Sequence, residues 1–201
     1  MERGESVLIV GFNTRPIASS ARKAGYVPIC VDRWDDLDLK VVCSKLYTVK
    51  AERSWDRKRR AEAFKQLVIR AIEEEKDLTF SVIGSGFDDD PSMWELLRKH
   101  TELLANEEGV RRRARNPVEV RRLAEEHGFK VPRTVVGRCK EDLERRLEEI
   151  GRPAVLKPLK SGGGIGTFIW RDGEEVEELE IKGPFLVQEL VRGIHASLSL
   201  I

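Results

Sequence analysis

Three observations predict an α/β fold in two parts for this 201-residue sequence. Ser6–Val10 is a continuous apolar run, which is typical of a parallel strand covered on both faces. Strand-like runs at 26–31 and 80–83 alternate with helical segments, which is the pattern of a Rossmann-like sheet. Near residue 115 the alternation gives way to short strands around a glycine-rich turn. We therefore expect a Rossmann-like domain over residues 1–114 and a second domain over 115–201.

In the first part, the helices are predicted from residues that favour their two ends. Asn13 or Thr14 can cap a helix that Pro16 opens and that ends near Gly25. The other expected elements are a short strand from 41–42 to 47–49, a long amphipathic helix over about 55–76, and a helix from 91 to about 104.

In the second part, a glycine-rich turn is expected at the tip of a hairpin. Asn116 and Pro117 open a helix that Gly128 closes, and a strand at 131–136 and a helix at 141–150 follow. Strands at 154–158 and 167–170 flank the turn, so they should pair with each other. Further strands are expected at 185–191 and 197–201.

Composition and charge argue against several classes of function. The 36 Lys and Arg residues nearly balance the 35 Asp and Glu, so no overall field attracts nucleic acid or a membrane surface. The basic run at 111–115 is typical of a solvated helix face. The first apolar run is too short for a signal peptide or a membrane-spanning helix. We expect a cytoplasmic protein with no nucleic-acid or membrane partner.

The cysteines and histidines do not have the spacing of a zinc site. Cys30, Cys43 and Cys139 are far apart, and no C-x-x-C pair is present. The histidines at 100, 127 and 195 also lack ligand spacing. A reduced intracellular setting is therefore expected, and no residue is assigned to a metal.

The first glycine turns fit a dinucleotide site poorly. Gly11 is followed by Phe12-Asn13-Thr14, so the turn lacks the second and third glycines that a pyrophosphate requires. Gly84 and Gly86 also follow a strand, but the three aspartates at 88–90 would repel phosphate.

The later glycine turn is the better candidate for a nucleotide site, since three segments agree. Lys157 ends an apolar strand, and a glycine-dense turn follows it. Glycines let backbone N–H groups approach an anion, and the lysine adds a point charge for phosphate. A strand-like segment about 30 residues on offers backbone donors and acceptors to an adenine edge. The predicted ligand-binding residues are Lys157, Ser161, Gly162, Gly163, Gly164, Gly166, Gln188, Glu189, Leu190 and Val191. The structural alternative is an ordinary strand-end lysine beside a plain hairpin.

These segments resemble the ATP-grasp superfamily. The matching motifs are Asn116-Pro-Val-Glu-Val, 128–134, Lys157-Pro158, Ser161–Gly166 and Gln188–Gly193. The opening 11–16, with 36–40, looks like an archaeal branch described as predicted carboxylate ligases related to biotin carboxylase. The resemblance covers essentially the whole chain. It implies a pre-ATP-grasp Rossmann-like domain over 1–114 and a truncated ATP-grasp domain, the first subdomain and hinge, over 115–201.

The resemblance also implies a reaction. Such enzymes use ATP and Mg²⁺ to convert a carboxylate into an acyl-phosphate, which an amine or another nucleophile then attacks. In this chain, Lys157 would hold the α- and β-phosphates, and Ser161–Gly166 would close over the β- and γ-phosphates. Glu189 and Val191 would contact adenine through backbone atoms, with Gln188 beside them. The Mg²⁺ ligands are expected beyond Ile201, and no catalytic residue is assigned.

The chain departs from the family pattern at two further positions. His195 stands where the family often has a glutamate that binds ribose. The family lysine near Asn116-Pro117 is absent, and Arg115 is the nearest substitute.

A substrate carboxylate is expected at the end of the first strand. Asn13, Thr14 and Arg15 follow this strand at its carboxyl end, where open α/β sheets bind ligands. Helix capping explains Asn13 or Thr14 equally well, whereas the forked donors of Arg15 suit a carboxylate.

Two hypotheses about function follow. The chain is the amino-terminal part of an ATP-grasp ligase, or it is a non-catalytic nucleotide-binding or interaction subunit. In either case, an apolar surface around 185–191 and 198–201 would be covered by self-association or by a missing carboxyl-terminal half.

Overall fold

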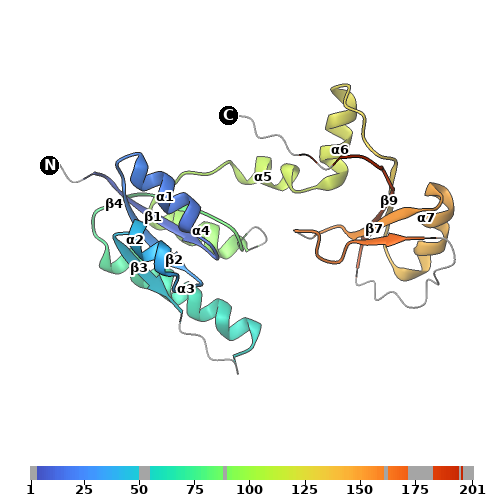
Figure 1. Cartoon of the computed structure of the whole chain (residues 1–201). Helices are drawn as coiled ribbons and strands as arrows, with labels where there is room; N and C mark the ends of the chain where they lie inside the picture. The colour runs from blue at the N-terminus through green and yellow to red at the C-terminus, as the bar shows by residue number, and fades with distance from the viewer. Residues whose placement is uncertain are drawn as a thin grey trace. The chain divides into compact units, whose positions relative to one another are not determined.

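The computed structural model forms two compact units, residues 1–106 and 107–201 (Figure 1). It describes residues 4–49, 55–87, 90–160, 163–171, 183–194 and 196. The predicted strand at 197–201 and the predicted ribose-site residue His195 lie outside these residues.

The first unit contains a five-stranded parallel sheet, which confirms the predicted Rossmann-like fold. The strand order is β3-β2-β1-β4-β5, and every neighbouring pair is parallel. Its elements are β1 (Ser6–Gly11), α1 (Arg15–Lys23), β2 (Val27–Asp32), α2 (Leu37–Val42), β3 (Lys45–Thr48), α3 (Arg57–Glu74), β4 (Leu78–Ile83), α4 (Pro91–His100) and β5 (Glu102–Leu103).

Helices cover both faces of this sheet, as the uninterrupted apolar run in β1 predicts. Val7 and Ile9 pack with Ala18 of α1 and Leu39 of α2. Alternate β1 residues point to the other face, where they join a core cluster with side chains of α3 and α4, namely Leu8, Val10, Phe64, Val68, Met93 and Leu97. The continuous run of the sequence is thus divided between two cores.

Two predicted boundaries in this unit are wrong. Residues 41–42 end α2 instead of starting a strand, because Leu39 is buried as part of a helical turn. The helix that begins at Pro91 ends at His100, not near residue 104. Thr101 is extended and its Oγ1 lies 2.6 Å from Ser81 Oγ, so the chain turns directly into β5.

The turns after β1 and β4 bind each other through the backbone. Gly84 N donates to Val10 O at 2.7 Å, and Phe12 N donates to Ser85 O at 2.9 Å. Gly86 has a φ of +102°, and a Cβ there would lie 2.5 Å from the Phe12 ring. Glycine is therefore needed at position 86 for packing between the two turns.

The second unit contains a four-stranded antiparallel sheet of order β6-β9-β7-β8. The Asn116 carboxamide oxygen accepts from Val118 N and Glu119 N, which confirms the predicted start of α6. The elements are α5 (Glu108–Ala114), α6 (Pro117–Glu126), β6 (Thr134–Gly137), the 3₁₀ turn η1 (Lys140–Asp142), α7 (Leu143–Ile150), β7 (Ala154–Pro158), β8 (Phe168–Trp170) and β9 (Phe185–Glu189).

The two compact units divide before α5, whereas the predicted domain boundary at 114/115 falls at its end. The boundary at 114/115 stays a prediction.

Strand β9 lies in the middle of its sheet, which corrects one expectation. Phe185–Glu189 pairs with β6 on one side and with β7 on the other, and Phe185, Leu186 and Val187 are buried. The expected uncovered apolar surface therefore does not include these residues, although Val191 is exposed. Self-association, or cover by a carboxyl-terminal half, stays a prediction.

Candidate functional site

The antiparallel sheet of the second unit has two chemically different faces. One face packs against α7 (Figure 1) through a buried cluster that includes Leu147, Leu156, Phe185 and Val187. Because paired residues share a face, the register places a second set of side chains on the opposite face. That set, here called the open face, consists of Thr134, Val136, Val155, Lys157, Ile169, Leu186 and Gln188.

The polar side chains of the open face form one chain of hydrogen bonds. Lys157 Nζ donates to Gln188 Oε1 at 2.9 Å, and Gln188 Nε2 donates to Thr134 Oγ1 at 2.8 Å. The Thr134 hydroxyl then donates to Pro132 O at 2.9 Å. Lys157, Gln188 and Thr134 are all half-buried. Two of the predicted ligand-binding residues, Lys157 and Gln188, are thus in direct contact.

Glu189 is held in place by the strand beside it. Its N donates to Arg133 O at 2.9 Å, and its Oε1 accepts from Arg133 N at 2.9 Å. This reciprocal pair fixes the end of β9, from which Leu190 and Val191 continue. Leu190 is half-buried and Val191 is exposed.

The glycine turn lies at the tip of the β7–β8 hairpin, as predicted. Gly163, Gly164 and Gly166 have φ values of +62°, +75° and +74°, which favour glycine. Thr167 N donates to Gly164 O at 3.1 Å, which closes the turn. The other two predicted residues, Ser161 and Gly162, lie outside the described residues.

The predicted substrate residues of the first unit follow β1, but they differ in what they can bind. Thr14 is fully buried, and both its N and its Oγ1 donate to Asp32 Oδ2 at 2.6 Å. Thr14 occupies the N-cap position of α1, one of the two positions expected, but its side chain makes no cap bond to the helix because its hydroxyl donates to Asp32. Arg15 pairs with Asp38 at the surface, and Asn13 is exposed.

Thr134 and Asp32 are absent from the residues predicted to form sites. Asp32 is 1% exposed and also accepts from Trp34 N at 2.7 Å, so it organises the turns at the carboxyl end of the parallel sheet. The signal for Asp32 was its position directly after a buried apolar strand. Thr134 ends the motif at 128–134, but nothing in that motif points to its partner Gln188, which is 54 residues away in the sequence.

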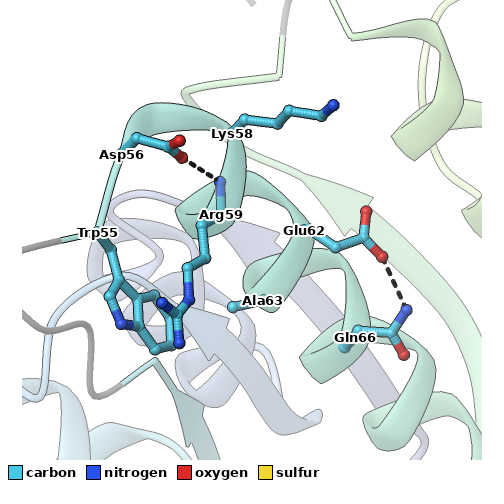
Figure 2. A pocket seen from close by; sticks show the side chains of 7 residues that line it. All are labelled: Trp55, Asp56, Lys58, Arg59, Glu62, Ala63 and Gln66. Atoms are coloured by element: carbon cyan, nitrogen blue, oxygen red, sulfur yellow. Dashed lines mark hydrogen bonds between the residues drawn. The ribbon is translucent and has the colours of Figure 1, made fainter.

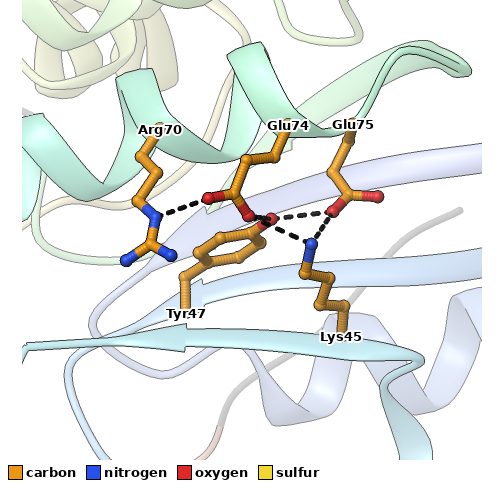
Figure 3. Close-up of polar contacts among 5 residues, drawn as sticks. All are labelled: Lys45, Tyr47, Arg70, Glu74 and Glu75. Atoms are coloured by element: carbon orange, nitrogen blue, oxygen red, sulfur yellow. Dashed lines mark hydrogen bonds and ion pairs between the residues drawn. The ribbon is translucent and has the colours of Figure 1, made fainter.

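Two other clusters in the first unit contain none of the predicted residues. A surface hollow of about 460 Å³ lies at the start of α3, where the Arg59 guanidinium lies 4.5 Å from the Trp55 ring centroid (Figure 2). Five charged and polar side chains also join β3 to α3 (Figure 3), and these are Lys45, Tyr47, Arg70, Glu74 and Glu75. The charged groups of the network in Figure 3 bond to one another, which is typical of a structural role.

The described residues contain neither a cluster of possible metal ligands nor a helix that could span a membrane. No three His, Cys, Asp or Glu among them gather as possible ligands of one ion. In the same part of the chain, no helix is long and apolar enough to cross a bilayer.

Comparison with known families identifies the second part of the chain. Residues 115–201 match the model of the ATP-grasp domain. This stretch is therefore similar to ATP-grasp domains. The match includes Lys157, the glycine turn and 188–191, the segments on which the resemblance was based. The narrower resemblance, to an archaeal branch related to biotin carboxylase, stays a prediction.

Curated relatives extend the similarity into the first unit. The chain is 26% identical over 176 residues to formate-dependent phosphoribosylglycinamide formyltransferase of Pelobacter propionicus, covering 86% of this chain and 41% of that protein. The protein of the same name from Actinobacillus pleuropneumoniae is 26% identical over 167 residues, covering 82% of this chain and 39% of that protein. The chain thus spans about two fifths of the length of these relatives.

Solved structures share the fold over nearly the whole chain. An ADP complex of N5-carboxyaminoimidazole ribonucleotide synthetase has a TM-score of 0.65 at 20% identity, covering 95% of this chain and 49% of that chain. The Aspergillus clavatus carboxyaminoimidazole ribonucleotide synthase complexed with ATP has a TM-score of 0.63 at 16% identity, covering 95% and 48%. The parallel sheet and the antiparallel sheet that follows it therefore correspond to about half of the chain in each of these structures.

Proposed function

We propose that this chain is the ATP-binding portion of an ATP-grasp ligase that activates a carboxylate as an acyl-phosphate. The observation that carries the proposal is the position of Lys157 on the open face, at the base of the glycine turn. An ammonium beside a turn of positive-φ glycines provides both charge and backbone donors for a triphosphate. Solved structures of similar fold contain ADP or ATP, which supports adenine nucleotide as the ligand.

The described residues suggest a division of labour around the nucleotide. Lys157 neutralises charge on the α- and β-phosphates, and the turn that includes Gly163, Gly164 and Gly166 covers the β- and γ-phosphates. Backbone atoms of 189–191 contact the adenine edge, next to the apolar side chains of the open face. Ser161 and Gly162 belong to the same proposed turn.

The proposed reaction has two steps. A carboxylate oxygen of the acid attacks the γ-phosphorus, the bond to the β,γ-bridging oxygen breaks, and ADP leaves. A nucleophile, such as an amine, then attacks the acyl carbon and phosphate leaves. Mg²⁺ lowers the charge on the phosphates when it is bound. The described residues do not gather into a Mg²⁺ site, so we assign none of them to the metal.

A substrate carboxylate is proposed to bind after β1. Arg15 and Asn13 are accessible there, and Arg15 would exchange its surface ion pair with Asp38 for the carboxylate. Thr14 serves this site indirectly, because its two bonds to Asp32 hold the turn that carries its neighbours.

Calorimetric titration of the full chain with ATP tests the proposal. Lys157→Met should weaken ATP binding about 10- to 100-fold, because a charge-assisted contact to phosphate is lost. Lys130→Met, at an exposed position in the same unit, is the matched control and should bind like the unaltered chain. Absence of ATP binding by the unaltered chain would contradict the proposal.

Product analysis separates the ligase from the alternative, a non-catalytic nucleotide-binding or interaction subunit. Incubation with ATP, Mg²⁺, a nucleophile and a panel of carboxylic acids, together with a carboxyl-terminal half that supplies the expected Mg²⁺ ligands, should release ADP and phosphate when the correct acid is present. ATP that binds tightly and stays intact with every acid and nucleophile offered would favour the alternative.

A further inference from the structure

The hydrogen-bond chain of the open face has an unambiguous direction. The Lys157 ammonium can only donate, so the Gln188 atom that faces it must be the carbonyl oxygen Oε1. The Gln188 amide nitrogen then points to Thr134, whose hydroxyl accepts from it and donates to Pro132 O. A flipped amide would place N–H groups against the ammonium, and its oxygen could accept from the Thr134 hydroxyl only if Thr134 gave up its bond to Pro132 O. Thr134 therefore fixes which end of Gln188 meets Lys157.

Gln188, the partner of Lys157 among the described residues, is neutral. Among the described residues, no carboxylate lies within ion-pair distance of Lys157, whereas many surface lysines and arginines of this chain are paired. An amide oxygen restrains the ammonium without cancelling its charge. A carboxylate at the same place would restrain it and also neutralise it, so an incoming phosphate would have to break an ion pair.

We propose that Gln188 is a positioning residue that holds Lys157 toward the nucleotide phosphates while leaving its charge uncompensated, and that Thr134 orients Gln188. This inference rests on the proposed function, since it assumes that Lys157 binds phosphate. It assigns Gln188 a task different from lying beside adenine, and it brings Thr134 into the site. The strand register supports it, because Thr134 and Gln188 are directly paired across β6 and β9.

Four substitutions distinguish the positioning of the Lys157 ammonium from the charge of the group beside it. Gln188→Met keeps the length of the side chain and removes the amide, so Lys157 loses its restraint. Gln188→Glu keeps a restraint but adds a competing negative charge. Thr134→Val removes the partner of the Gln188 amide, whereas Thr134→Ser keeps the hydroxyl and is the matched control.

The test compares ligands that share adenine but differ in phosphate. Calorimetry measures the affinities for ADP and ATP. An NMR titration measures the affinity for adenosine, which is expected to bind more weakly. Gln188→Met and Thr134→Val should each weaken ATP binding about 3- to 10-fold, the effect of one hydrogen bond. Gln188→Glu should weaken it by at least about tenfold, because a charge pair now competes. Adenosine affinity should change by less than about twofold in every variant, and Thr134→Ser should match the unaltered chain.

Each contrary outcome has a distinct meaning. Equal losses for adenosine and ATP would show that Gln188 only supports the sheet, and they would overturn the inference. Gln188→Glu binding ATP as well as the unaltered chain would also overturn it. If Lys157→Met weakens ATP binding and the Gln188 and Thr134 variants do not, the inference fails while the proposed function stands. If the unaltered chain binds no nucleotide, both fail.

Discussion

Thr14 donates two hydrogen bonds to one carboxylate oxygen of Asp32, from its backbone N and from its Oγ1, each at 2.6 Å. Both residues are almost completely buried. The bonds join the start of α1 to the end of β2, so the turn after β1 is fixed by a contact with the neighbouring strand. A buried carboxylate is stable only when its oxygens are satisfied, and here the backbone N of Trp34 supplies a third bond.

Removing the Thr14 hydroxyl should destabilise the first unit. Thr14→Val keeps the shape of the side chain but deprives buried Asp32 of a donor, which costs about 1–3 kcal/mol. Thr14→Ser keeps the hydroxyl and should cost no more than about 1 kcal/mol for the lost methyl group. Urea unfolding followed by circular dichroism measures the difference. Equal stability of the Val variant and the unaltered chain would contradict this reading of the Thr14–Asp32 contact.

Two glycines with similar backbone angles should respond differently to alanine. Gly86 and Gly25 have φ values of +102° and +92°, so Ala at either position pays about 1–2 kcal/mol of backbone strain. At Gly86 the new Cβ would also lie 2.5 Å from the Phe12 ring, whereas nothing lies within 4 Å at Gly25. Gly86→Ala should therefore cost about 1–3 kcal/mol more than Gly25→Ala in the same urea experiment. A smaller loss at Gly86 would show that the Phe12 ring moves aside freely.

The network that joins β3 to α3 should make stability depend on pH (Figure 3). Hydrogen bonds from Arg70, Tyr47 and Lys45 lower the pKa of Glu74 from 4.5 to about 2. Because the folded-state pKa lies below the unfolded value, Glu74 stabilises the fold above pH 4.5, and this contribution is lost as the pH falls from 4.5 to about 2.

Measuring the free energy of unfolding at a series of acidic pH values tests this effect of Glu74. Glu74→Gln should lower the free energy of unfolding at pH 7, and its deficit should shrink as the pH falls through the acid range. Glu73→Gln, at an exposed position on the same helix, is the control and should run parallel to the unaltered chain. A Glu74→Gln deficit that stays constant down to about pH 2.5 would contradict the lowered pKa.

Much of the fold follows from patterns that are local in the sequence. The continuous apolar run of β1 predicts a strand buried on both faces, and Asn116-Pro117 predicts the start of α6. The glycine turn between 154–158 and 168–170 predicts the hairpin, because positive φ and strand pairing are both encoded within a few residues. For the same reason Lys157 is recognisable without the structure.

The errors come from contacts between distant residues. Thr14 is a residue type that commonly caps helices, but its hydroxyl donates to the buried carboxylate of Asp32, 18 residues away in the sequence. Val41 lies in an apolar run that suggests a strand, yet it is 73% exposed on a short helix whose Leu39 is buried. Thr134 becomes part of the candidate site only when β6 pairs with β9, and no local pattern reports that register.

The alternation along β9 limits how this protein can vary in length. Phe185 and Val187 face α7, whereas Leu186 and Gln188 face the other way. Losing Val187 would turn the Gln188 amide into the apolar core and bring the Glu189 side chain to the position beside Lys157. Residues can therefore be added to or removed from β9 only in pairs if Gln188 is to stay beside Lys157.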